Sequence, residues 1–251
     1  MYHTTGFRKD QILDLCAILT EHFGPFAKRT GRRRELGLFK SVAVTLTYLR
    51  RNHVQQELAE LFGASQSTIS RTITRLTPLL GRVLNAWVPT VDDLDPQMQL
   101  IVDGTLLPCW SWADRPELWS GKHRTTGVNV QVACDLSGTL AWVSDPSPGR
   151  THDARAIREW GFLNGRADDL GDKGYIGTGM ITPIRKPPGR QLHETEKEFN
   201  KEINSIRATV ERVIANLKTW RIFHTDYRRP FHTFHDTITA VISLEFYRMT
   251  Y

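Results

Sequence analysis

The spacing of apolar residues changes abruptly at the Pro- and Asp-rich stretch "PTVDDLDP", residues 89–96. Residues 1–85 contain no convincing strand, and their apolar residues recur at helical intervals, as in Leu38, Val42, Leu46 and Leu49. Beyond the stretch they alternate, as in "GVNVQVACD", where Val128, Val130 and Val132 share one face. This change predicts an all-α domain over residues 1–88, a linker over 89–97 and an α/β domain over 98–251.

The composition is that of a folded protein without a membrane anchor. Of the 251 residues, 40% are hydrophobic and 10% are aromatic, which argues against disorder. No apolar run approaches the ~20 residues that span a bilayer, and the start "MYHTTGFRKD" lacks the apolar core of a secretory signal. We therefore expect an intracellular protein with no membrane partner. The three cysteines lack the paired spacing of a zinc site, and the formal charge of +6 is compatible with a polyanionic partner.

Residues 54–80, "VQQELAELFGASQSTISRTITRLTPLL", have the layout of a helix-turn-helix. Gly63 offers a left-handed turn residue, and Ser65 can cap the second helix. The apolar positions expected to be buried are Val54, Leu58 and Leu61 in the first helix and Ile69, Ile73 and Leu76 in the second.

The second helix of such a motif lies in the major groove and presents its first residues to bases and phosphates. Here those residues are short polar groups followed by cations: Gln66, Ser67, Thr68, Ser70, Arg71, Thr74 and Arg75. A basic run upstream contains Arg32, Arg33 and Arg34. A plain helical hairpin with a solvated basic loop is the alternative. The polar start of the second helix and the arginine run favour binding of double-stranded DNA.

The second part of the chain predicts strands followed by helices. Three stretches have strand patterns: "MQLIVDGT", "GVNVQVACD" and "TLAWVSD". We expect a helix from about Asp153, a strand at "MITPI" and a long helix from about Glu194 to Leu217. The last segment, "FHTFHDTITAVISLEFYRM", has apolar residues at helical spacing and is expected to be a packing helix. This order predicts a mixed sheet flanked by helices.

Three acids occupy positions at which such a fold commonly binds ligands. Asp103 sits where the strand "LIV" stops, Asp172 follows the apolar stub of "DLGDKGY", and Glu211 lies on the late helix. Strand ends in α/β sheets converge on a crevice. Carboxylates gathered there repel one another unless cations neutralise them, and oxygen-only ligands suit Mg²⁺ or Mn²⁺. Two such ions can activate a water or hydroxyl and stabilise the leaving oxygen of a phosphodiester.

Each acid taken alone also has an ordinary explanation. Asp103 and Asp172 can be turn residues, and Glu211 can pair with Arg207 one helical turn away. In "RATVERVIANLK", however, Arg207, Glu211 and Lys218 fall within an arc of roughly 40°. These three residues lie along the edge of an apolar stripe made of Ile206, Val210, Val213, Ile214 and Leu217. If this stripe packs on the sheet, its edge faces the strand ends that carry the other acids.

The ordered motifs resemble those of DDE transposases of the insertion-sequence and Harbinger-like branch. The matching segments are "VDGT" around Asp103, "GDKGY" around Asp172, "RATVERVIANLK" around Glu211, and also "SGKHRTTGVNVQVACD", "GRTHDARAI" and the N-terminal helix-turn-helix. The resemblance covers roughly residues 39–223. It implies an RNase H-like catalytic domain in which Asp103, Asp172 and Glu211 are the catalytic, metal-binding triad.

The resemblance assigns further roles. Lys122 is expected to bind DNA, and Arg207 and Lys218, on either side of the glutamate, are expected to face DNA phosphates or to steady the glutamate. Asp153 is a candidate fourth metal-binding acid, although N-capping of the helix that it begins would also explain it. Related transposases have a Tyr where this chain has Asn204, so one contact with DNA is expected to differ.

The resemblance implies a transposase that binds the terminal inverted repeats of an insertion element. It would use two ions, Mg²⁺ or Mn²⁺, to cut the DNA strand and transfer it to a target. Because two element ends are processed together, a homodimer or larger assembly on DNA is expected, cytoplasmic at the nucleoid in a prokaryote or nuclear in a eukaryote. The alternatives are a catalytically silent DNA-binding regulator derived from a transposase and an RNase H-like nuclease without strand transfer.

Overall fold

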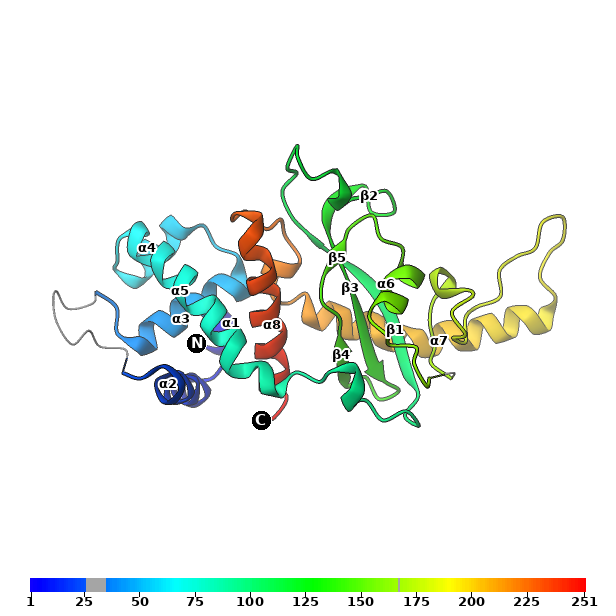
Figure 1. Cartoon of the computed structure of the whole chain (residues 1–251), viewed down its shortest axis with the longest axis horizontal. Helices are drawn as coiled ribbons and strands as arrows, with labels where there is room; N and C mark the ends of the chain where they lie inside the picture. Colours follow the sequence, from blue (N-terminus) through cyan, green and yellow to red (C-terminus); the bar gives the residue numbers. More distant parts are fainter. Residues whose placement is uncertain (26–34, 167) are drawn as a thin grey trace. The chain divides into compact units, whose positions relative to one another are not determined.

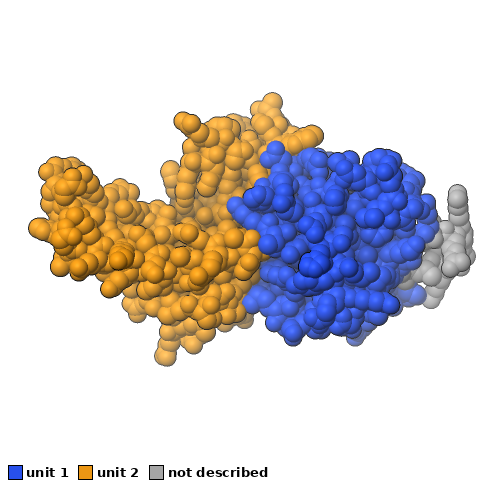
Figure 2. Space-filling view, turned by 180° about the vertical axis from the view of Figure 1, so that it is seen from behind, with its two compact units in different colours: residues 1–88, 218–251 blue, residues 89–217 orange. Residues whose placement is uncertain are grey.

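In the computed structural model, which describes residues 1–25, 35–166 and 168–251, the chain forms two compact units. Unit 1 comprises Met1–Val88 together with Lys218–Tyr251, and unit 2 comprises Pro89–Leu217 (Figure 2). The expected basic run of Arg32, Arg33 and Arg34 lies outside the described residues. Within the described ranges, no helix is both long and apolar enough to cross a membrane.

Unit 1 is helical. Its elements are α1 (Tyr2–Thr5), α2 (Lys9–Phe23), α3 (Leu38–Arg51), α4 (Gln55–Phe62), α5 (Gln66–Leu84), α8 (Phe234–Arg248) and the 3-10 turns Asn85–Trp87, Arg221–Phe223 and Phe231–Thr233. Helices α5 and α8 lie side by side (Figure 1) and are in close contact, because a Cβ placed on Gly81 would lie only 3.4 Å from the backbone nitrogen of Ala240. The packing helix predicted at the end of the chain is therefore confirmed as α8.

The sequence assigns residues 218–251 to the α/β domain, whereas in the structure they pack with the N-terminal helices. Trp220 is fully buried, its ring lies 6.2 Å from that of Phe7, and its indole N–H donates to Glu245 over 2.8 Å. Such a large side chain needs apolar surroundings together with a hydrogen-bond partner, and unit 1 provides both. The apolar face of α8 is visible in the sequence, but the surface that receives it is not.

The helix-turn-helix is confirmed together with its local signals. Gly63 ends α4 at φ 63°, a left-handed conformation that suits glycine. Ser65 begins α5, and its hydroxyl oxygen accepts a hydrogen bond of 3.2 Å from the backbone N–H of Thr68. The predicted buried positions of α5 are confirmed: Ile69, Ile73 and Leu76.

The prediction for the first helix of the motif is wrong in part. Leu58 is fully buried as expected, but Val54 and Leu61 are 47% and 64% exposed. Ala59 is buried in their place. The helix is only two turns long, so two adjacent positions suffice to bury its inner face.

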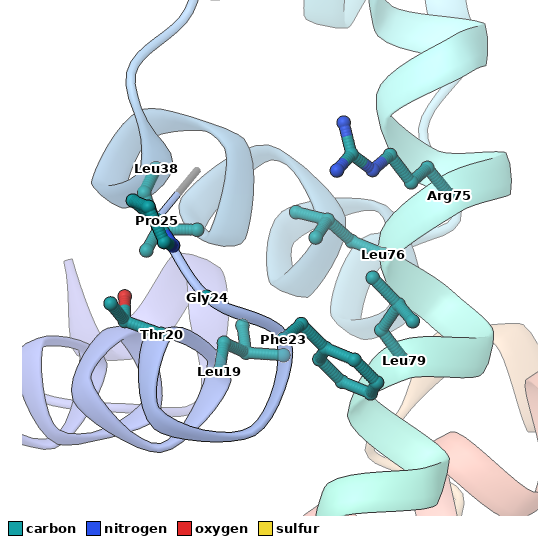
Figure 3. A pocket seen from close by; sticks show the side chains of 9 residues that line it. All are labelled: Leu19, Thr20, Phe23, Gly24, Pro25, Leu38, Arg75, Leu76 and Leu79. Carbon is teal, nitrogen blue, oxygen red and sulfur yellow. The ribbon is translucent and has the colours of Figure 1, made fainter. Parts of the chain in front are cut away.

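A small hollow lies beside α2 and α5 in unit 1 (Figure 3). It is lined by Leu19, Thr20, Phe23, Gly24, Pro25, Leu38, Arg75, Leu76 and Leu79. Its volume of about 30 Å³ leaves room for about one water molecule. The hollow is far too small to hold a nucleotide and is a packing feature of the helical unit.

Unit 2 is an α/β domain with a mixed sheet flanked by helices, as predicted. Its elements are β1 (Leu100–Pro108), β2 (Trp119–Ser120), β3 (Thr125–Asp135), β4 (Leu140–Val143), β5 (Ser147–Pro148), α6 (Asp153–Glu159), α7 (Glu194–Leu217) and the 3-10 turns Val91–Asp93, Pro116–Leu118 and Lys173–Tyr175. The central strand β3 pairs antiparallel with β1 and β4. On the other edge of β1, Ile101 pairs in parallel with Leu170, and Leu170 pairs in parallel with Ile181. The strand expected at "MITPI" is thus reduced to the single bridge at Ile181.

The two faces of β1 serve different purposes. Leu100 and Val102 point into an apolar cluster under α6 that also contains Ala133, Trp142, Ile157, Phe162 and Tyr175. Because side chains alternate along a strand, Ile101 and Asp103 face the opposite side, against which α7 packs. Figure 1 shows α7 crossing behind β1 and β3, with α6 in front of them. Asp103 is therefore the acid that β1 presents to α7.

Candidate active site

Asp103 occupies the middle of β1 and is paired in register with Val132 of β3. Its side chain is 17% exposed, and its Oδ2 lies 3.6 Å from a guanidinium nitrogen of Arg207 on α7. Its Oδ1 accepts a hydrogen bond of 2.9 Å from the N–H of Gly104. The sheet and α7 thus hold the first predicted acid between them, and its mid-strand position excludes the turn explanation.

Asp172 caps the 3-10 turn Lys173–Tyr175, and its Oδ1 accepts 2.6 Å from the N–H of Gly174. It follows Leu170 by two residues, and the backbone of Leu170 is hydrogen-bonded to β1 on both sides, through Leu100 and Val102. This pairing carries the second predicted acid to the edge of β1. The capping bond is the ordinary role that the sequence also allowed.

Asp153 is the first residue of α6 and is buried. Its Oδ1 accepts hydrogen bonds from the side-chain amides of Asn129 (2.9 Å) and Gln131 (3.3 Å). Its Oδ2 accepts one from the ammonium group of Lys122 over 3.1 Å. Burial raises the pKa of Asp153, but the Asn129 hydrogen bond, followed by the nearby Lys122 charge, outweighs burial and lowers the pKa overall.

Two glycines show how closely these carboxylates approach the backbone. A Cβ on Gly104 would lie 2.1 Å from the Oδ1 of Asp153, so only glycine leaves space for this carboxylate next to Asp103. A Cβ on Gly174 would lie 2.7 Å from the Oδ1 of Asp172 and 3.4 Å from the Oδ2 of Asp153. Because both oxygens lie this close to the same point, the carboxylates of Asp172 and Asp153 are neighbours. The two carboxylates thus lie close to each other and, through Asp153, to the backbone beside Asp103.

Burial and the neighbouring charges shift the pKa of Asp103. Burial raises its pKa to about 6, the charges of Arg207 and Lys122 oppose this increase, and the carboxylates of Asp172 and Asp153 add to it. Because burial is the main cause, the raised pKa shows chiefly that the ionised carboxylate of Asp103 is poorly solvated at this position. A cation bound to this carboxylate would favour its ionised form and so offset the effect of burial.

Glu211, the third expected acid, makes no hydrogen bond or ion pair with a described residue. Its side chain is exposed on α7. Arg207, one turn earlier, pairs with Asp103 rather than with Glu211. Because four helical residues rise about 6 Å, the Glu211 backbone lies one turn from the residue that contacts Asp103. The described side chains contain no group of three or more His, Cys, Asp or Glu in a metal-binding arrangement.

Comparison with known families shows the family of the chain. Residues 102–244 match the family described as "DDE superfamily endonuclease", and residues 34–86 match "Helix-turn-helix of DDE superfamily endonuclease". The chain is a DDE superfamily endonuclease. The first match includes Asp103, Asp172 and Glu211, and the second includes α4 and α5.

Two relatives of this DDE endonuclease cover most of its length. The "Putative transposase for insertion sequence element IS112" of Streptomyces albus G is 34% identical over 228 residues, which are 87% of this chain and 83% of the relative. The "Probable transposase for insertion sequence element IS702" of Microchaete diplosiphon is 27% identical over 216 residues, 80% of this chain and 77% of the relative. No solved structure matches the chain.

The aspartates of this DDE endonuclease fit the divalent metal on which the superfamily generally depends. The donors of Asp103 and Asp172 are carboxylate oxygens, the ligand type that hard divalent cations prefer. The two groups are close enough for the Asp172 carboxylate to add to the increase that burial causes in the pKa of Asp103. Asp153 fits less well, because three side chains already donate to its two oxygens.

The DNA-contacting positions expected on α5 are mostly at its surface. Gln66, Ser67, Arg71 and Arg75 are exposed, and Thr68 is half-buried. The guanidinium of Arg71 folds back onto Ser67, donating 3.1 Å to its carbonyl and 3.3 Å to its hydroxyl. The hydroxyl of Thr68 donates to Glu35 over 2.6 Å, so this side chain has a structural partner.

The three cations expected around the catalytic acids have different environments. Lys122 and Arg207 lie at the aspartates, paired with Asp153 and Asp103 respectively. Lys218 follows α7 directly, belongs to unit 1 and is half-buried, and burial lowers its pKa. The structure therefore places two of the three cations at the acids of this DDE endonuclease.

Several residues that shape the site were missed by the sequence analysis. Asn129 and Gln131 hold Asp153, and the hydroxyl of Tyr175 donates to the Gln131 side-chain oxygen over 2.5 Å. Alternation in "GVNVQVACD" places these two amides on the same face of β3, a signal that the apolar pattern concealed. The buried pair of Arg166 and Asp169 gave no comparable signal, because it joins two loop residues.

Proposed function

We propose that this DDE superfamily endonuclease is the transposase of a DNA insertion element. The observation that carries the proposal is the convergence of Asp103 and Asp172 at the edge of β1, in a chain that also contains a helix-turn-helix. Both named relatives are described as transposases of insertion sequences, and they align with most of the chain. Its substrate is then double-stranded DNA, at the element ends and at the target.

The two units divide the work in this proposal. The helix-turn-helix of residues 54–80 recognises the terminal inverted repeats, with Gln66, Ser67, Arg71 and Arg75 turned toward DNA. Unit 2 carries out strand cleavage and transfer. We retain Thr68 as a weaker contact, because its hydroxyl already donates a hydrogen bond to Glu35. The run Arg32, Arg33 and Arg34 adds salt-dependent phosphate contacts.

We propose that the enzyme uses two divalent ions, Mg²⁺ or Mn²⁺, and that Asp103 and Asp172 would hold them. When bound, these ions would supply an activated water or hydroxyl and stabilise the leaving oxygen. Glu211 is proposed as the third ligand, for which its free carboxylate on the turn after Arg207 is suited. Asp153 is proposed as a positioning residue, since its oxygens are occupied by Asn129, Gln131 and Lys122.

The cations at the site have a role in both states of the enzyme. Arg207 and Lys122 stabilise the crowded aspartates while no metal is present. With metal held at Asp103 and Asp172, Arg207 and Lys122 would be available to bind phosphates of the substrate. Lys218 would bind the strand beyond the cut. Two element ends must be processed together, so we propose a homodimer or larger assembly on DNA, located at the nucleoid as the bacterial relatives suggest.

A supercoiled donor plasmid carrying both element ends tests this function. Incubated with the protein and Mg²⁺, it should give nicked donor and joined products. Binding without nicking would instead indicate a catalytically silent regulator. Nicking without joined products would indicate a nuclease that lacks strand transfer.

A further inference from the structure

A segment from the C-terminal part of the chain lies against the helix-turn-helix. The guanidinium of Arg229 donates a hydrogen bond of 2.6 Å to the hydroxyl of Thr74 on α5. Arg228, its neighbour, donates over 2.6 Å to the carbonyl of Asn52, which ends α3 in a left-handed conformation. The side chain of Asn52 in turn donates to Thr225 over 2.7 Å. The segment is therefore fixed to two helices of unit 1.

The residue just before the two arginines anchors this segment. Tyr227 is fully buried and stacks on Phe234 with ring centroids 4.3 Å apart and an interplanar angle of 14°. Its hydroxyl is within hydrogen-bonding distance of Thr233 (2.6 Å) and Thr237 (3.1 Å). Because the anchor is rigid, the position of Arg229 beside α5 is set by packing and not by a single surface hydrogen bond.

Thr74 belongs to the side of α5 that is turned away from the core. On a helical wheel, Ser67, Arg71 and Thr74 fall within an arc of about 60°. This arc is opposite the buried residues Ile69, Ile73 and Leu76. Arg229 thus adds a positive charge to the stripe that a helix-turn-helix presents to DNA, although about 155 residues of chain lie between it and Thr74.

The charge of Arg229 is available for a ligand. Among the described residues it donates to a neutral hydroxyl and forms no ion pair, in contrast to Arg207 and Arg166 in unit 2. Thr74 follows Ser67 by seven residues, which is about 10 Å along the helix axis. The major groove is about 12 Å wide. With the start of α5 at the base edges, Arg229 reaches the phosphates at the border of the groove.

We propose that Arg229 is a phosphate contact that the C-terminal segment adds to the helix-turn-helix. The inference rests on the proposed function, since it requires α5 to bind duplex DNA. Phosphate contacts fix the register of a protein on DNA without reading the sequence. Arg229 should therefore strengthen binding to element ends and to unrelated duplexes by similar factors.

The test is the salt dependence of binding to a duplex from the element end, measured by fluorescence anisotropy with the full chain. One lost phosphate contact lowers the slope of log K against log salt by about 0.9 and weakens binding about eightfold at 0.1 M salt. Arg229→Ala should show this loss on the element end and on an unrelated duplex. Arg229→Lys, which keeps the charge, should restore most of the slope. The matched control Arg8→Ala, at an exposed arginine before α2, should keep the parental slope.

An unchanged slope for Arg229→Ala would overturn the inference, as would a loss of affinity that follows only from a lowered melting temperature. In either case Arg229 would be a tether for the C-terminal segment, and DNA binding by α5 would stand. Absence of binding by the unaltered chain would overturn the proposed function and this inference with it. Arg71→Ala, which changes the recognition helix itself, distinguishes the two, because it should weaken binding whether or not Arg229 contributes.

Discussion

Asp153 illustrates how single residues shape the site. Three side chains donate to its two oxygens, and Gly104 leaves it just enough space against β1. A carboxylate held in this way keeps its charge although it is buried, as its lowered pKa indicates. Its position also limits where the neighbouring strand can run. Asp153 therefore positions the backbone of β1, which carries Asp103.

Replacing Gly104 with Ala should impair cleavage. The added methyl group would lie 2.1 Å from the Oδ1 of Asp153, so either the carboxylate or β1 must move. Misplacement of catalytic groups by about 1 Å can cost on the order of 10²-fold in rate. We expect a loss of this size in the plasmid nicking rate, with duplex binding retained.

Gly121→Ala is the matched control for this change. Nothing lies within 4 Å of a Cβ at Gly121, so its nicking rate should equal that of the parent. If Gly104→Ala also cut at the parental rate, the proposed positioning by Asp153 would be wrong. Thermal unfolding of both variants would show whether the fold survives.

At the scale of elements, a buried ion pair holds the segment that leads to Asp172. Arg166 and Asp169 are in contact at 2.6 Å, with side chains 4% and 3% exposed. Asp169 also accepts 2.8 Å from the backbone N–H of Leu100 at the start of β1. Arg166 donates to the carbonyls of Asp95 and Met98, in the segment before β1. The pair thus fastens the Leu170 bridge, and with it Asp172, to β1.

Asp169→Asn should destabilise the protein by about 3 kcal/mol, because removing one partner leaves the other charge buried and unpaired. The measurement is the free energy of unfolding in urea. Glu159→Gln is the control, since it breaks an exposed pair with Arg155 on α6 and should cost less than about 1 kcal/mol. Equal effects of the two substitutions would contradict the structural role of the buried pair.

The helices also show what could be predicted from the sequence. The helix-turn-helix and the bounds of α7 follow from local signals such as Gly63, Ser65 and apolar spacing. The rotation of α7 does not: Ile206, expected in the core, is 41% exposed, and Arg207 is buried in its place. The cause is the partner of Arg207, Asp103, which is more than one hundred residues away. An ion pair between residues so far apart in the chain produces no periodic pattern in the sequence.

At the scale of the whole molecule, the helical unit is formed by two segments of chain that flank unit 2. The chain therefore passes between the units twice, after Val88 and after Leu217. The spacing of apolar residues reveals the first passage, because the pattern there changes from that of helices to that of strands. The second passage joins one helix to the next, so no change of pattern marks it.

Residues 1–88 without residues 218–251 should therefore fail to fold cooperatively. Their α5 would expose the surface around Gly81 that receives α8, and the burial of Trp220 against Phe7 would be lost. Circular dichroism should show a broad, weakly cooperative thermal transition. Joining residues 1–88 to 218–251 by a flexible linker should restore a sharp one. A sharp transition for residues 1–88 alone would contradict the division into units.

The central claim, that the aspartates on β1 and after Leu170 form the catalytic centre of a transposase, is tested most directly by one measurement. The parent chain and Asp103→Asn, each shown to be folded, are incubated with the supercoiled donor plasmid and Mg²⁺. The claim predicts nicked and joined products with the parent, and the same DNA binding but no cleavage with the variant. Cleavage by Asp103→Asn at the parental rate, or no cleavage by the parent, would contradict it.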